Sequence, residues 1–153
     1  MIQAPQLKHF ATLKVEIDAP LEVGVSIHGE RRVIPITGGH VQGDGWKGSV
    51  LKGGADFQLI VTPRMTHLDA QYVIELDNGE LIFIQNKAIR VASAEVTQKI
   101  KAGISVDPEL IYFRCSPVFE TSSPSMQWIT ERVFVGTGVR QPDLVELQIF
   151  EVL

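Results

Sequence analysis

Apolar and polar side chains alternate along most of the chain. At positions 13–17 every second residue is apolar, with Lys14 and Glu16 between them, and the same alternation resumes at 21–27 after the turn residues Ala19 and Pro20. A period of two is typical of β-strands that bury one face. The pattern therefore predicts an all-β protein of about ten strands, the others lying at 31–36, 45–51, 57–62, 68–76, 80–86, 111–115, 128–135 and 144–152.

One segment departs from this alternation. Ser93 is a good helix N-cap, Val96 and Ile100 are spaced for one helical face, and Gly103 stands where a helix usually ends. This pattern predicts one short helix. No linker, repeat or change of composition divides the chain, so residues 1–153 are expected to form a single domain.

The strongest local signal is Asn78-Gly79 between two alternating runs, which favours a β-hairpin. A two-residue loop at these positions would pair Asp77 with Glu80 and would set Gln71 opposite Asn86. Asp69 would then lie two positions away on the same face, and polar side chains would gather at the end of the hairpin remote from its turn. Large apolar residues occupy both faces of this hairpin. That favours an antiparallel β-barrel, with a β-sandwich as the alternative.

Composition and charge narrow the function classes. The chain has 153 residues, 44% of them hydrophobic, and its formal net charge is −4. There is no basic run to neutralise a phosphate backbone, so nucleic-acid binding is not expected. No signal-peptide pattern or membrane-spanning apolar run is present, which predicts a soluble, cytoplasmic protein without a membrane partner. The single cysteine, Cys115, excludes an internal disulfide and multi-cysteine clusters, and no cofactor is expected.

Two further patterns predict neither a metal site nor a phosphate-binding loop. The four histidines lack the spacing by which two imidazoles of one element share a metal, so no metal ligand is predicted. The glycines between positions 38 and 54 are followed by no helix pattern, and no lysine precedes Ser49 as in a phosphate-binding loop. They are better explained as turns and bulges where strands bend around a barrel.

Three stretches together resemble a known family. They are 36–58, with Ile36-Thr37-Gly38-Gly39 at its start and Gly53-Gly54-Ala55-Asp56 near its end; 68–72, Leu68-Asp69-Ala70-Gln71-Tyr72; and 112–138, with Tyr112-Phe113-Arg114, Phe119-Glu120-Thr121, Trp128 and Phe134-Val135-Gly136. Their order and spacing resemble the domain-of-unknown-function family 3237, small and mostly microbial proteins. The resemblance implies a single-domain antiparallel β-barrel without an established general activity. Gln71 stands where the family pattern has arginine, and Thr130 where it has asparagine. If that arginine belongs to the family site, ligand chemistry differs in this chain.

Three acids lie beside apolar residues instead of in solvated stretches: Asp56, Asp69 and Glu120. They could be structural, accepting backbone N–H groups or pairing with Arg90 and Arg114. They could instead line a polar pocket, where a desolvated carboxylate acts as a general base. Asp69 and Asp56 are the candidate catalytic residues under this second interpretation.

Candidate ligand-binding side chains surround these acids. Tyr112 and Arg114 share one side of their strand, and Trp128 and Arg132 are expected to do the same on theirs, giving aromatic faces with a cation. The full candidate set is Gln71, Tyr72, Asn86, Tyr112, Arg114, Glu120 and Trp128.

These residues are compatible with two functions. They do not determine whether a reaction is catalysed. The first is a barrel whose lumen binds a small organic metabolite, with acid-base chemistry by Asp69 or Asp56. The alternative is a structural or interaction protein that forms a homodimer and has a packed interior. A pocket of a few hundred Å3 lined by Asp69, Asn86 and Arg114 would favour the first.

Overall fold

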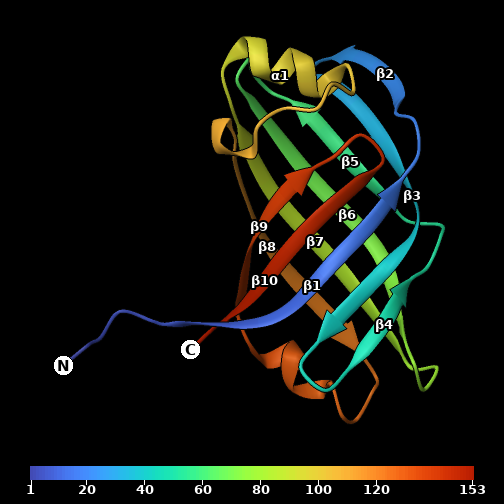
Figure 1. Cartoon of the computed structure of the whole chain (residues 1–153), viewed down its shortest axis with the longest axis vertical. Helices are drawn as coiled ribbons and strands as arrows, with labels where there is room; N and C mark the ends of the chain where they lie inside the picture. Colours follow the sequence, from blue (N-terminus) through green and yellow to red (C-terminus); the bar gives the residue numbers. More distant parts are fainter.

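The computed structural model describes all residues, 1–153, and is built mainly from antiparallel strands (Figure 1). One α-helix and two short 3-10 helices complete it. The strands are β1 (Leu7–Ile17), β2 (Leu21–Ser26), β3 (Gly29–Gly43), β4 (Lys47–Val50), β5 (Ala55–Ile60), β6 (Met65–Leu76), β7 (Leu81–Val91), β8 (Tyr112–Thr121), β9 (Phe134–Arg140) and β10 (Leu144–Val152); the helices are α1 (Ala94–Lys101), η1 (Pro108–Leu110) and η2 (Gln127–Glu131).

The strands close into a barrel because β3 is long enough to pair on both sides of the sheet. Its first half pairs with β2 and β5, and its second half pairs with β1 and β4. At Gly39 the backbone φ is +139°, and a Cβ there would collide with the backbone oxygen of Lys14. Glycine is therefore required where β1 and β3 approach to close the barrel. The all-β barrel and the ten strands predicted from the alternation are confirmed.

Both ends of the barrel are covered (Figure 1). At one end lies α1, whose Thr97 and Ile100 are buried and whose Ser93 Oγ accepts the Val96 N–H at 3.1 Å, so the predicted helix and its cap are confirmed. At the other end lies η2. The structure contains no helix that is long and apolar enough to cross a membrane.

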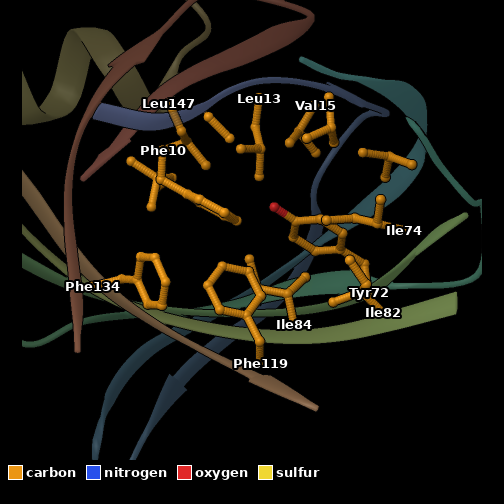
Figure 2. Close-up of a cluster of buried hydrophobic side chains, with 14 of the residues drawn as sticks. Phe10, Leu13, Val15, Tyr72, Ile74, Ile82, Ile84, Phe119, Phe134 and Leu147 are labelled. Carbon is orange, nitrogen blue, oxygen red and sulfur yellow. The ribbon is translucent and has the colours of Figure 1, made fainter. Parts of the chain in front are cut away.

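The core fills the lumen between these ends. Figure 2 shows apolar side chains from strands around the barrel meeting in its interior, with the hydroxyl oxygen of Tyr72 directed among them. The three phenylalanines Phe10, Phe119 and Phe134 pack with ring centroids 4.9–5.9 Å apart. Their burial is the main source of stability at the η2 end.

The predicted register of the β6–β7 hairpin is wrong by one residue. The observed loop has three residues, because the Leu76 N–H donates to the Glu80 carbonyl at 2.8 Å and the Gly79 N–H donates to Leu76 at 2.8 Å. Only Gly79 has positive φ, at +86°, which is the type I turn with a glycine bulge and not the two-residue turn expected. Gln71 consequently lies opposite Gln85, and Asn86 lies opposite Ala70 on the other face of the sheet.

The strand expected at 128–135 is also corrected. Residues Gln127–Glu131 form η2, and β9 begins only at Phe134. The Thr130 Oγ1 donates to the Gln127 carbonyl at 2.8 Å, a local bond that competes with strand pairing. Trp128 and Arg132 therefore do not share the face of one strand.

The hairpin loop gives the first testable prediction. Gly79→Ala should lower the free energy of unfolding by about 1–2 kcal/mol, because a Cβ is disfavoured at positive φ. Gly79→Asn should lose less than half of that amount, since asparagine tolerates this conformation. Urea unfolding of both variants measures the difference; equal losses would contradict a bulge at position 79.

Candidate functional site

Polar side chains point into the lumen at the α1 end of the barrel. Arg32 on β3 lies opposite Gln58 on β5, and Thr66 on β6 lies opposite Arg90 on β7. All four are buried, with exposed fractions between 1% and 4%. Asp56 lies on the same inward face of β5, two residues before Gln58. One end of an otherwise apolar lumen is therefore polar.

A cavity of about 40 Å3 lies beneath this polar layer. At roughly 10–15 Å3 for each water, it holds about three water molecules. Ile17, Arg140 and Val145 in its lining are partly exposed, so the cavity approaches solvent on their side. Its other lining residues are apolar ones from several strands and the polar residues Asp56, Gln58, Tyr72, Asn86 and Arg90.

Three buried polar atoms at this cavity have no hydrogen-bond partner: Tyr72 Oη, Asn86 Oδ1 and Arg90 Nη1. Each belongs to a residue that is at most 4% exposed. Leaving a buried donor or acceptor unpaired costs about 1–3 kcal/mol, so native proteins rarely do it. No other buried side-chain nitrogen or oxygen in the protein is left in this state. The unpaired groups are thus confined to one place and converge on one space.

Asp56 supplies the titratable carboxyl of the cavity. Its Oδ2 accepts from Gln58 Nε2 at 2.9 Å, and its Oδ1 accepts from the Asp69 backbone N–H at 3.1 Å. Burial raises the pKa of Asp56 above its ordinary value, although these hydrogen bonds and the charge of Arg90 act in the opposite direction. A carboxyl of this kind is suited to exchanging a proton with a bound molecule.

Arginines make the same end strongly basic. Burial lowers the pKa of Arg90 to about 10, Asp56 opposes the change, and the positive charges of Arg140 and Arg32 add to it. Burial also lowers the pKa of Arg140, and Arg32 again contributes. Arg32 itself is paired through Nε with Glu22 of β2 at 2.9 Å.

Two neutral groups complete the electrostatics of the lumen. Burial raises the pKa of the Tyr72 hydroxyl, and the nearby Cys115 and Asp56 raise it further. Burial also raises the pKa of Cys115 to about 11. Tyr72 therefore stays protonated and can donate a hydrogen bond, while Cys115 stays a thiol.

Asp69 and Gln71 lie on the outer face of the barrel wall. Asp69 Oδ1 accepts from Gln71 Nε2 at 3.4 Å and from Gln85 Nε2 at 3.2 Å. Asp69 and Arg114 line an open outer groove of about 610 Å3. The pocket expected from Asp69, Asn86 and Arg114 together does not form, because the corrected register turns Asn86 into the lumen.

The remaining predicted residues are dispersed. Tyr112 is 54% exposed, and the guanidinium of Arg114 lies 5.0 Å from its ring centroid on the outer surface. Glu120 is exposed on β8. Trp128 packs on Phe10, 5.5 Å between centroids, at the η2 end of the barrel. Of the nine predicted residues, the structure brings together at the cavity Asp56, Tyr72 and Asn86.

Sequence reasoning missed three residues of the cavity lining, Gln58, Arg90 and Arg140, and the buried Arg32 that lies opposite Gln58. The alternation of apolar and polar residues along each strand could have identified them. Arg32 has the same parity as the apolar Ile34 and Ile36, and Gln58 has the same parity as the apolar Ile60. A polar residue in the apolar phase of a strand marks a buried polar position.

Comparisons with known proteins agree with this geometry. The family described as "Protein of unknown function (DUF3237)" matches residues 5–152. The chain belongs to this family. A relative from Rhodopseudomonas palustris (strain TIE-1), a UPF0311 protein, is 40% identical over 148 residues, 97% of each chain. Another UPF0311 protein, from Clostridium acetobutylicum, is 37% identical over 142 residues, 92% of this chain and 90% of the other.

Solved structures show how well the family shares this barrel. The chain is similar to a conserved protein of unknown function from Rhodopseudomonas palustris, with a TM-score of 0.93, 38% identity and coverage of 99% of this chain and 100% of the other. A β-barrel-like protein from Acinetobacter baumannii gives a TM-score of 0.86 at 36% identity, covering 100% of this chain and 99% of the other. An enzyme from Penicillium herquei gives 0.70 at 18% identity, with 97% of both chains covered, a likeness of fold alone.

The raised pKa of Asp56 predicts a pH dependence of stability. The folded protein keeps this proton to higher pH than the unfolded chain, whose carboxyl titrates near 3.8. The contribution of Asp56 to the free energy of unfolding therefore falls as pH rises from about 3.8 to the raised value, by at most about 1.4 kcal/mol per pH unit. Asp56→Asn should lose this dependence and gain stability relative to the natural protein across the window.

Urea unfolding between pH 3.5 and 8 measures this difference. Glu16→Gln, which removes an exposed carboxylate of β1, is the matched control. The same pH dependence in both variants would contradict a desolvated Asp56.

Proposed function

We propose that this protein binds a small organic molecule at the polar end of its lumen, and that Asp56 exchanges a proton with it. The observation that carries the proposal is the convergence of three unpaired buried groups, Tyr72 Oη, Asn86 Oδ1 and Arg90 Nη1, on one cavity. A bound molecule would satisfy all three at once, which would recover the desolvation cost of these groups.

The groups also define what the molecule must offer. Arg90 only donates hydrogen bonds and Asn86 Oδ1 only accepts them, while the Tyr72 hydroxyl can do both. The ligand therefore needs at least one acceptor and one donor, joined by a carbon skeleton that packs on lining residues such as Leu68 and Phe113. A small oxygenated metabolite has this composition.

The barrel wall is a suitable support for such a site. Tyr72, Asn86 and Arg90 project from paired strands and not from loops, so their positions are fixed by backbone hydrogen bonds. Proton transfer requires an acid or base held in place near the reacting atom, and Asp56 is held by two hydrogen bonds at the same cavity.

One observation favours the structural alternative. The cavity of about 40 Å3 is far below the few hundred Å3 of a usual ligand pocket, so most of the interior is packed. The exposed apolar side chains Val25 and Ile27, at 89% and 95%, would then serve a homodimer interface beside β2. Under this alternative the unpaired groups would bind only water.

Tyr72→Phe separates the two functions. It removes a hydroxyl that has no partner, so the melting temperature should stay the same or rise. Affinity for any molecule bound in the lumen should fall about tenfold, the value of one hydrogen bond. Native mass spectrometry of the purified protein identifies what is bound, and thermal melts with that compound give the affinity of each variant.

Ser123→Ala is the control, because it removes a buried hydroxyl that does have a partner, Ser125 Oγ at 3.2 Å, at the η2 end. It should lose stability and keep ligand affinity. If no compound binds the natural protein, or if one binds Tyr72→Phe equally well, the lumen proposal is wrong.

A further inference from the structure

Arg90 is buried without a counter-ion. Its side chain belongs to a residue only 4% exposed, it forms no ion pair and no hydrogen bond, and Nη1 is wholly unpaired. Its guanidinium lies over the Phe113 ring, 5.9 Å from the centroid, which is a weak contact for a full charge. A buried charge without an ion-pair partner is strongly destabilising, so an anion bound at this place would stabilise the folded protein.

The other charges of the lumen do not supply that anion. Glu22 is engaged by Arg32. The oxygens of Asp56 accept from Gln58 and from the Asp69 backbone, and neither lies within ion-pair distance of Arg90. Arg140 adds a second cation to the cavity lining. Two arginines and a single acid thus leave the cavity with an excess of positive charge.

Resting on the function proposed above, we infer that the lumen ligand is a small carboxylate whose carboxylate group pairs with Arg90. The guanidinium presents a planar fork of donors that matches the two oxygens of a carboxylate. The cavity has room for a few heavy atoms, and Phe113, Leu68 and Val145 line it with apolar surface for a short carbon chain. The Tyr72 hydroxyl can donate to the same carboxylate or to a second oxygen of the ligand.

The shape of the cavity favours a carboxylate over a tetrahedral oxyanion. Phosphate and sulfate need donors on several sides, whereas the wholly buried unpaired donors here are Arg90 Nη1 and Tyr72 Oη, and the lining is mostly apolar. A carboxylate has one polar edge and one apolar attachment, which matches a polar end above an apolar lumen.

The probe is propionate, which offers the carboxylate and the short carbon chain but no donor for Asn86 Oδ1. Propionamide is its uncharged counterpart of the same shape. Thermal melts of the whole protein at constant ionic strength should show a saturable rise in Tm with propionate, of a few degrees at about ten times the dissociation constant. Propionamide should give no rise. Inorganic phosphate and sulfate are measured alongside at the same ionic strength.

Three variants locate the effect. Arg90→Met removes the buried charge while keeping an unbranched apolar chain, so the unliganded protein should melt at the same or a higher temperature and should lose the response to propionate. Arg90→Lys keeps the charge without the fork and should bind propionate at least tenfold more weakly. Arg64→Met, an exposed arginine in the β5–β6 turn, is the control and should respond like the natural protein.

The outcomes are distinct. A response to propionate alone, lost in Arg90→Met, supports the carboxylate site. Equal responses to propionate and propionamide would overturn it and leave the proposed function standing, with a neutral ligand. A response to phosphate or sulfate instead, a response unchanged in Arg90→Met, or no response to any probe would also overturn it. The proposed function fails separately, if native mass spectrometry finds no bound molecule at all.

Discussion

The pairing of β6 with β7 determines what the lumen contains. Every second residue of both strands faces inward, so the loop that fixes their register also decides which side chains are buried. The three-residue loop closed by Leu76 and Glu80 places Tyr72, Asn86 and Arg90 inside and Asp69 and Gln71 outside. A shift of β7 by one residue would turn Asn86 and Arg90 outward and would leave Tyr72 inside. The unpaired groups of Asn86 and Arg90, and the part of the positive charge that Arg90 supplies, therefore depend on this register.

Most of the architecture follows from local signals in the sequence, because a strand with one buried face must alternate. The limits of β10 and the helix cap at Ser93 are examples, since each depends on neighbouring residues only. The hairpin register was harder, because Asn78-Gly79 is compatible with both a two-residue and a three-residue loop. Leu76 faces inward in either register. A two-residue loop would turn Leu81 inward as well, and the three-residue loop turns it outward. The apolar residues near the loop therefore do not decide between the two registers. Packing around the whole barrel selects the register with the three-residue loop.

The site could be predicted only in part for the same reason. Asp56 was a candidate because it stands among apolar residues, Tyr72 because it belongs to a stretch that resembles the family, and Asn86 through a hairpin register that the structure corrects. Their partners come from strands distant in sequence. Arg32 lies across from Gln58, and Arg140 approaches from β9, contacts that exist only once the barrel is closed. The prediction for Asp69 was right about its neighbourhood and wrong about the direction of its side chain. Its backbone N–H binds Asp56, so it helps to hold the site through its main chain while its side chain faces the outer groove.

The two ends of the lumen differ in how they are packed. At the η2 end Phe10, Phe119 and Phe134 fill the interior, and Ile84 and Ile149 have no exposed surface. At the α1 end the inward positions of β6 and β7 include Ala70 and Ala88, whose short side chains leave the cavity open. Larger apolar residues at these positions would increase stability, since they would fill the space and remove unpaired groups. Burial of the aromatic cluster at the η2 end offsets the cost of the unpaired groups at the α1 end, so the barrel folds with a polar cavity where the proposed ligand would bind.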